Sequence, residues 1–263
     1  MLAVTPPSLT TFKRRAGAPT PTFRVYCFPH AGAGPTMFNQ KWFTTVGFPE
    51  TVDVVGIMIP GRLSRFREPA LRSIAEITAL LANELEPIFS KPQMPFIFLG
   101  HSMGTVVAFE FIQEMKRRGW TLPLHLIVSG RMAPHEISRD TPIAHLPDQQ
   151  FLDIMERRYN YTRIDPELEQ LILPSMKADI FTVENYRCPH PADVPDRKLS
   201  MPITAFTGTR DRHVFLDQVQ TWASWTTGPF TIHQVNAGHF YYELPEYTQV
   251  VRQIVTATAS RAQ

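Results

Sequence analysis

Residues 95–104 read PFIFLGHSMG and join an apolar run to the start of a helical pattern. The run PFIFL has the length and the side chains of a buried strand. The residues after it predict a helix over Met103–Arg118 that stops at Gly119. Between the two lies Gly100-His101-Ser102-Met103-Gly104, a G-x-S-x-G pattern typical of a tight strand-to-helix turn that exposes a nucleophilic serine. Its glycines let the strand and the helix approach, and we expect a strained backbone at Ser102.

Short apolar runs of the same kind recur along the chain and alternate with helical patterns. Several are apolar nearly throughout, as strands buried on both faces of a sheet are, and most connections can hold a crossover helix. Together with the G-x-S-x-G turn, which is called a nucleophile elbow, this pattern predicts an α/β-hydrolase fold, in which helices flank a mostly parallel central sheet. The expected strands are 24–28, 52–59, 95–99, 125–129, 203–207 and 230–235.

One connection is far longer than a crossover requires, because about seventy residues, 131–199, separate two of the expected strands. Helical patterns over 147–158 and 165–185 predict a helical lid inserted above one edge of the sheet. Other helices are expected over 73–89, with Ser73 as N-cap, and from about residue 245 to 259.

The hydrolase domain is expected to span residues 23–263, with the lid inside it. Residues 1–22 are rich in Pro and Thr and have no apolar core of a secretion signal, so they predict a mobile, disordered tail. Lys13, Arg14 and Arg15 weakly resemble the basic residues of an organelle transit peptide, but the stretch is short and unpatterned.

The composition excludes several classes of protein. The 263 residues are 43% hydrophobic, enough for one large core, and the net charge of +2 does not favour a nucleic-acid partner. The two cysteines, Cys27 and Cys188, cannot build a disulfide framework, and no apolar run has the roughly 18 residues that span a membrane. We therefore expect a monomeric cytoplasmic protein without a cofactor. No metal is expected either, because no Cys or His cluster has metal-binding spacing.

A nucleophilic serine needs a neighbouring base, and the pKa of histidine suits that role at neutral pH. In α/β-hydrolases the order along the chain is Ser, then Asp or Glu, then His, each on a loop after a strand. Of the nine histidines, His239 in the segment NAGHF fits this order and position. His233 lies within the preceding strand, and the side chain of His101 is expected to diverge from that of Ser102.

The acid that orients the histidine is expected at Asp211, directly after the strand ITAFT and the residues GTR. Asp140 and Asp148 lie beyond the preceding strand, where some hydrolases place this acid, and remain alternatives. Glu243 is a weaker candidate near His239. Three other carboxylates in or near the lid are expected to be solvated: Asp179, Asp193 and Asp196.

An oxyanion hole needs two backbone N–H donors. One is expected from Met103, the residue after the nucleophile. The other is expected from Ala31 or Gly32, in the small, glycine-rich loop FPHAGAG that follows the first strand.

Several of these segments go beyond the generic elbow and resemble the type II thioesterases that serve polyketide and nonribosomal peptide synthases. The resemblance covers about residues 23–255. It rests on eight strings in this order: FPHAGAG, PGRLSRFREP, PFIFLGHSMG, SGRMAP, LPDQQFLDIM, LILPSMKADIFTVENY, PITAFTGTRD and AGHF.

The resemblance implies hydrolysis of acyl groups from the phosphopantetheine arm of acyl or peptidyl carrier proteins. By motif position it assigns the nucleophile to Ser102, the acid to Asp211, the base to His239 and the oxyanion donors to Ala31 and Met103. Two segments depart from the family pattern. Residues 157–161 read RRYNY where a glycine-rich stretch is expected, which leaves the acyl preference open, and AGAG stands where a double glycine is usual.

The lid patterns contain apolar side chains with the spacing of one helical face. That face could line an acyl chamber or pack between the lid and the body of the protein. The substrate-binding candidates are Phe151, Met155, Tyr159 and Tyr161, with Leu152 beside them.

Two basic clusters are candidates for docking a carrier protein. Arg62, Arg65 and Arg67 follow the second strand, on the side of the sheet where Ser102 is expected. Lys116–Arg118 end the helix that begins after Ser102, where the helix dipole favours cations without any partner.

Two other functions remain open at this stage. The elbow and the triad also fit a free-standing carboxylesterase or an acyltransferase acting on a soluble ester. A non-catalytic carrier-binding partner is the third possibility, and the complete Ser, Asp and His set argues against it.

Overall fold

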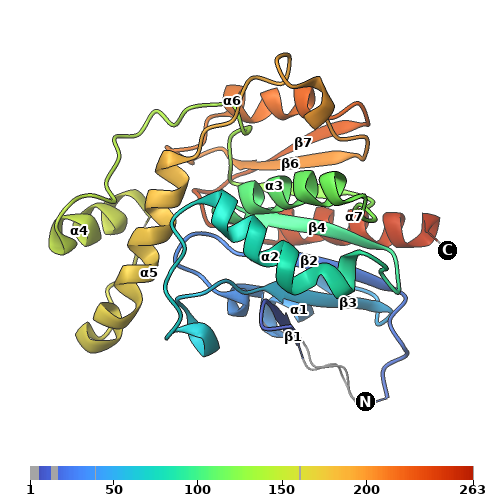
Figure 1. Ribbon diagram of the computed structural model, residues 1–263, viewed down its shortest axis with the longest axis horizontal. Coiled ribbons are helices and arrows are strands. Elements are labelled where there is room, and N and C mark those ends of the chain that lie inside the picture. Colours follow the sequence, from blue (N-terminus) through green and yellow to red (C-terminus); the bar gives the residue numbers. More distant parts are fainter. Residues whose placement is uncertain (1–5, 13–16, 39, 160, 263) are drawn as a thin grey trace.

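In a computed structural model, which describes residues 6–12, 17–38, 40–159 and 161–262, a central sheet lies between two layers of helices (Figure 1). The strand order is β1-β3-β2-β4-β5-β6-β7, with β1 antiparallel to β3 and the other neighbours parallel. The strands are β1 Leu9–Thr11, β2 Phe23–Phe28, β3 Val52–Ile57, β4 Phe96–His101, β5 Leu126–Ser129, β6 Ile203–Gly208 and β7 Phe230–Val235.

Each face of the sheet is covered by its own set of helices. Helices α2 (Ile74–Phe89), α3 (Met103–Arg118) and α6 (Leu216–Gln220) contribute to one hydrophobic core, and α1 (Gln40–Val46) and α7 (Pro245–Arg261) to the other. Short 3-10 turns lie at Pro35–Phe38, Leu63–Arg65, Pro195–Arg197 and Thr221–Trp225. None of the helices in the described ranges is long and apolar enough to cross a membrane.

The predicted α/β-hydrolase architecture is confirmed, and most element boundaries fall within one or two residues of expectation. Ser73 caps α2 by accepting a hydrogen bond from the Glu76 N–H at 3.1 Å. Gly119 ends α3 with a left-handed backbone, φ 68°. Strand β1 and helices α1 and α6 are short elements that periodicity did not predict, because three to seven residues carry too little pattern.

The N-terminal residues correct our expectation of a mobile tail in part. Leu9–Thr11 pairs with β3 at the edge of the sheet, and the buried Ser8 side chain donates to Glu84 on α2. Arg65 Nη1 also donates to Ser8 Oγ, at 3.0 Å. The buried Ser8 side chain and the pairing of β1 with β3 therefore hold this segment in place. Residues 1–5 and 13–16 lie outside the described part of the chain.

The nucleophile elbow has the strained geometry that its sequence predicts. Ser102 has φ 53° and ψ −118°, a conformation that costs a non-glycine residue about 1–3 kcal/mol. Its N–H donates to the Ser129 carbonyl at 2.7 Å, which ties the turn to β5. A Cβ atom at Gly104 would lie 2.0 Å from the Phe28 carbonyl oxygen, so α3 can approach β2 this closely only with glycine there.

The insertion between β5 and β6 forms a lid of two helices, α4 (Asp148–Tyr159) and α5 (Pro166–Asn185). Figure 1 shows them together at one end of the sheet. They share a small apolar cluster that is separate from the two main cores and contains Phe151, Met155, Leu173 and Met176. The lid is therefore a packed unit that stands over the carboxyl ends of the strands, where Ser102 lies.

Candidate active site

A small cavity of about 60 Å³ lies between the lid and the carboxyl ends of the strands. Ser102 lies in its wall together with residues from the loops after β2, β5, β6 and β7 and from the lid. The polar part of the wall includes His30, Asp140, His213 and His239, and the lid contributes Met155, Tyr159, Ile180 and Val183.

Asp211 and His239 form a buried pair beside Ser102. His239 Nδ1 lies 2.7 Å from Asp211 Oδ2, and both side chains are less than a tenth exposed. Burial alone would raise the pKa of Asp211, but the hydrogen bond and charge of His239 and the backbone N–H of His213 lower it overall. An ionised Asp211 accepts a hydrogen bond from the Nδ1–H group of His239, and this tautomer leaves Nε2 as the basic nitrogen of the ring.

The other candidate acids are engaged elsewhere or exposed. Asp140 Oδ2 lies 2.8 Å from His213 Nδ1, and the exposed Asp148 pairs with Lys177 at 2.7 Å. Glu243 is exposed to solvent. Asp211 is thus the candidate that the structure brings to His239, while the alternatives at Asp140 and Asp148 lack that contact.

The loop after β2 resolves the choice between the two oxyanion candidates. The Gly32 N–H donates to Asp179 Oδ2 at 2.7 Å, so it is already used, whereas Ala31 lines the cavity beside Ser102. The His30 ring holds this turn through a contact of 2.8 Å between Nδ1 and the Ala31 carbonyl. Met103 follows Ser102 as the first residue of α3, where backbone N–H groups have no partner within the helix. Ala31 and Met103 therefore remain the candidate donor pair.

Asp179 and Arg62 form a buried ion pair, which corrects two of our predictions. Arg62 donates through Nη1 and Nη2 to the two carboxylate oxygens of Asp179, both at 2.8 Å, and through Nη1 to the Ala33 carbonyl. Asp179 is not a solvated lid charge, because its side chain is 1% exposed. Arg62 is not a docking residue, because its buried side chain holds the loop after β2, the candidate oxyanion loop, against α5.

Arg65 is a second structural arginine that sequence reasoning placed at the surface. Its side chain is 5% exposed and pairs with Glu84 at 2.8 Å and with Glu68 at 2.6 Å. Of the three predicted docking arginines, Arg67 alone is exposed. The predicted docking cluster is therefore wrong for Arg62 and Arg65, since local sequence does not reveal that the fold brings Asp179 to Arg62 and Glu84 to Arg65.

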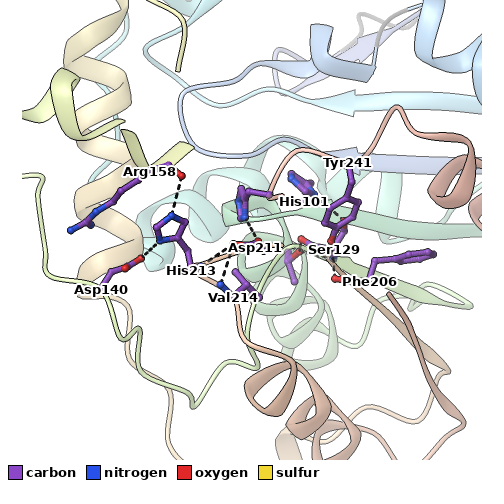
Figure 2. A network of polar contacts seen from close by, with 11 residues as sticks. His101, Ser129, Asp140, Arg158, Phe206, Asp211, His213, Val214 and Tyr241 are labelled. Atoms are coloured by element: carbon purple, nitrogen blue, oxygen red, sulfur yellow. Dashed lines mark hydrogen bonds and ion pairs between the residues drawn. The ribbon is translucent and has the colours of Figure 1, made fainter. Parts of the chain in front are cut away.

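The side chain of His101 turns away from Ser102 into the protein, as predicted. Its Nδ1 lies 2.9 Å from Ser129 Oγ, which donates to Tyr241, and the Tyr241 hydroxyl in turn donates to the Phe206 carbonyl (Figure 2). Burial holds the pKa of His101 well below its usual range. A neutral His101 ring lies 5.3 Å from the His239 ring, centroid to centroid, and supports it from behind. His233 stacks on Phe206 in the sheet, away from these groups.

His213 is a cavity residue that sequence reasoning missed. Its Nδ1 lies 2.8 Å from Asp140 Oδ2 and its Nε2 lies 3.0 Å from the Arg158 carbonyl, at the end of α4 (Figure 2). Both partners accept hydrogen bonds, so the ring satisfies both only as the doubly protonated cation. The hydrogen bond that His213 donates to the Asp140 carboxylate raises the pKa of His213. The position two residues after Asp211 was the signal available in the sequence.

The predicted acyl-binding residues divide into two groups. Met155 and Tyr159, one helical turn apart, line the cavity, and the Tyr159 ring lies 5.6 Å from the His239 ring. Burial raises the pKa of Tyr159 to about 12, so its hydroxyl stays protonated. Three predicted residues instead pack inside the lid cluster and do not line this cavity, which corrects their assignment: Phe151, Leu152 and Tyr161.

Comparison with known proteins identifies this arrangement. The model of the thioesterase domain family matches residues 23–258, most of the chain. The chain belongs to the thioesterase domain family. It is therefore a hydrolase that acts on thioesters, and the predicted resemblance to type II thioesterases is confirmed.

Three similar proteins place this thioesterase more closely. The gramicidin S biosynthesis protein GrsT of Aneurinibacillus migulanus is 30% identical over 230 residues, 86% of each chain. The thioesterase PikA5 of Streptomyces venezuelae is 33% identical over 227 residues, which cover 85% of this chain and 77% of the other. The solved structure of YbtT, a type II thioesterase from the yersiniabactin NRPS/PKS biosynthetic pathway, is 29% identical with a TM-score of 0.76 and covers 97% of this chain and 100% of its own.

Removing one partner of the buried Arg62–Asp179 ion pair is expected to lower the stability of this thioesterase markedly. Asp179→Leu strands the Arg62 guanidinium and should lower the free energy of unfolding by about 3–5 kcal/mol. The double variant Arg62→Met/Asp179→Leu should recover most of that loss, since no charge remains buried. Urea unfolding of Arg62→Met, Asp179→Leu and the double variant measures the coupling energy between the two side chains. Additive losses would show that the two side chains do not depend on each other.

The protonated state of His213 is expected to make the stability of the thioesterase depend on pH. Because the folded pKa is raised, the contribution is complete below the unfolded value of about 6.5 and is lost as pH rises through the folded pKa. The difference in unfolding free energy between wild type and His213→Gln should thus shrink as the pH rises above about 6.5.

The exposed His145 offers a matched control, His145→Gln, measured by the same urea titrations. A His213→Gln difference that stays constant with pH, as for this control, would contradict a cationic ring between Asp140 and the Arg158 carbonyl.

Proposed function

We propose that this thioesterase removes acyl groups from the phosphopantetheine arm of acyl or peptidyl carrier domains, with Ser102, His239 and Asp211 as its catalytic triad. The observation that carries the proposal is the buried Asp211–His239 hydrogen bond in the wall of the cavity that holds Ser102. The names of the relatives, which refer to gramicidin S biosynthesis and to an NRPS/PKS pathway, support carrier domains as partners.

In the proposed mechanism Ser102 Oγ attacks the thioester carbonyl while His239 Nε2 takes the hydroxyl proton. Asp211 keeps the ring in the correct tautomer and stabilises the imidazolium. The negative oxygen of the tetrahedral intermediate accepts hydrogen bonds from the N–H groups of Ala31 and Met103.

The intermediate collapses when the C–S bond breaks and the thiolate receives the proton from His239. Water then attacks the Ser102 acyl ester, again with His239 as base, and releases the free acid. Met155 and Tyr159 are the proposed lid contacts of the acyl group, because they face this reaction centre.

The triad is tested by ranking substitutions. Ser102→Ala is expected to lower kcat by about 10⁴- to 10⁶-fold with the fold intact, and Asp211→Asn by roughly 10⁴-fold because the wrong tautomer of His239 is favoured. Asp140→Asn and Asp148→Asn should cost far less than Asp211→Asn. Steady-state kinetics and circular dichroism check this order, and a greater loss for Asp140→Asn would move the acid to the earlier loop.

The substrate class is tested by three acyl donors that carry the same acyl group. We expect kcat/KM to be highest for the acylated carrier protein, lower for the acyl thioester of pantetheine and lowest for a p-nitrophenyl ester. A preference for the soluble ester would indicate a carboxylesterase. Acyl transfer to an added alcohol or amine in place of hydrolysis would indicate an acyltransferase, and binding of the carrier without turnover would indicate a non-catalytic partner.

A further inference from the structure

A second hollow, of about 870 Å³, opens beside the acyl cavity. The two share Tyr159, His213, His239 and Phe240, so the second hollow adjoins the reaction centre on the His239 side. We call it the arginine groove, because four arginines line it: Arg157, Arg158, Arg210 and Arg212.

The four arginines come from two distant parts of the chain. Arg157 and Arg158 end lid helix α4, and Arg210 and Arg212 flank Asp211 on the loop after β6. The fold thus gathers four positive charges around one hollow although the whole chain carries a net charge of only +2. The positive charges in such a cluster repel one another, and their electrostatic potential raises the local concentration of anions.

The guanidinium groups of the groove are not neutralised within the described part of the chain. Arg157 Nε donates to the Asp153 carbonyl at 3.1 Å, Arg158 Nη1 to the Thr141 carbonyl at 2.9 Å, and Arg210 Nη2 to the Asn236 carbonyl at 2.7 Å.

None of the four has an ion pair with a carboxylate among the residues that the structure covers, and the nearby Asp140 and Asp211 already bind histidines. Arg62 and Arg65, by contrast, are buried in ion pairs. The groove therefore keeps free N–H donors and uncompensated positive charge at the edge of the active site.

We propose that the arginine groove binds the phosphodiester of the phosphopantetheine arm. The inference rests on the proposed function, in which an arm enters with its thioester end toward Ser102. The anionic end of the arm then lies outside the acyl cavity, where the groove begins. The planar guanidinium fork matches two phosphate oxygens, and the 42%-exposed Phe240 ring adds an apolar surface for the methyl groups of the arm.

The test uses the variant Arg157→Ser/Arg212→Ser. Both side chains are exposed, whereas Arg158 and Arg210 are left intact because they hold the carbonyls of neighbouring loops. The matched control is Arg117→Ser, since Arg117 is exposed at the far end of α3, a helix roughly 24 Å long. Three substrates with one acyl group are compared: acylated carrier protein, acyl-phosphopantetheine and acyl-pantetheine, which lacks the phosphate.

We expect the ratio of kcat/KM for acyl-phosphopantetheine to that for acyl-pantetheine to fall about tenfold in the double variant and to keep its wild-type value in Arg117→Ser. The ratio for the acylated carrier protein to acyl-pantetheine should fall at least as far, with a weaker dependence on ionic strength.

Unchanged ratios would overturn the inference. So would a loss confined to the acylated carrier protein, because the arginines would then meet carrier side chains and not the phosphodiester. If the wild-type enzyme failed to hydrolyse the acylated carrier protein at all, the proposed function would fall first, whatever the variant does.

Discussion

The close approach of α3 to the sheet is the constraint on which the rest of the structure depends. Gly104 lies against the Phe28 carbonyl, and Ser102 is held in a strained conformation by its N–H bond to Ser129. The elbow places Ser102, the proposed nucleophile, at the start of a helix and beside the loop that follows β2. The packing of the main cores on both faces of the sheet offsets the energetic cost of this local strain.

Ion pairs and hydrogen bonds then join the loops around the elbow into one site. Arg62 and Asp179 fasten the oxyanion loop to α5, while His213 joins the Asp211 loop to Asp140 and to the end of α4. The two lid helices are thus attached to the two loops that are proposed to carry the oxyanion donor Ala31 and the acid Asp211. The lid shapes the cavity and also supports the groups that are proposed to react.

The sequence allowed the fold, the elbow and the His239 and Asp211 positions to be predicted, because each depends on local pattern and on order along the chain. It did not reveal that Asp179 is buried, since its partner Arg62 lies 117 positions away. It also placed Phe151 and Tyr161 in the acyl chamber, because periodicity identifies the apolar side of a helix but not which of its turns reaches the cavity. The Ala31 and Gly32 alternatives could be separated only by seeing which N–H is already bonded.

The different anchoring of the two lid helices bears on how acyl selectivity can evolve or be engineered. Helix α5 carries Asp179, whose bonds reach Arg62 and Gly32, so a transplanted α5 must bring a compatible arginine and glycine-rich loop with it. Helix α4 supplies Met155 and Tyr159 to the cavity and is tied to the body near the cavity through the Arg158 carbonyl, a backbone group that every sequence retains. Exchange of α4 must therefore preserve only its packing on α5 within the lid, whereas exchange of α5 must in addition preserve the ion pair with the body of the protein.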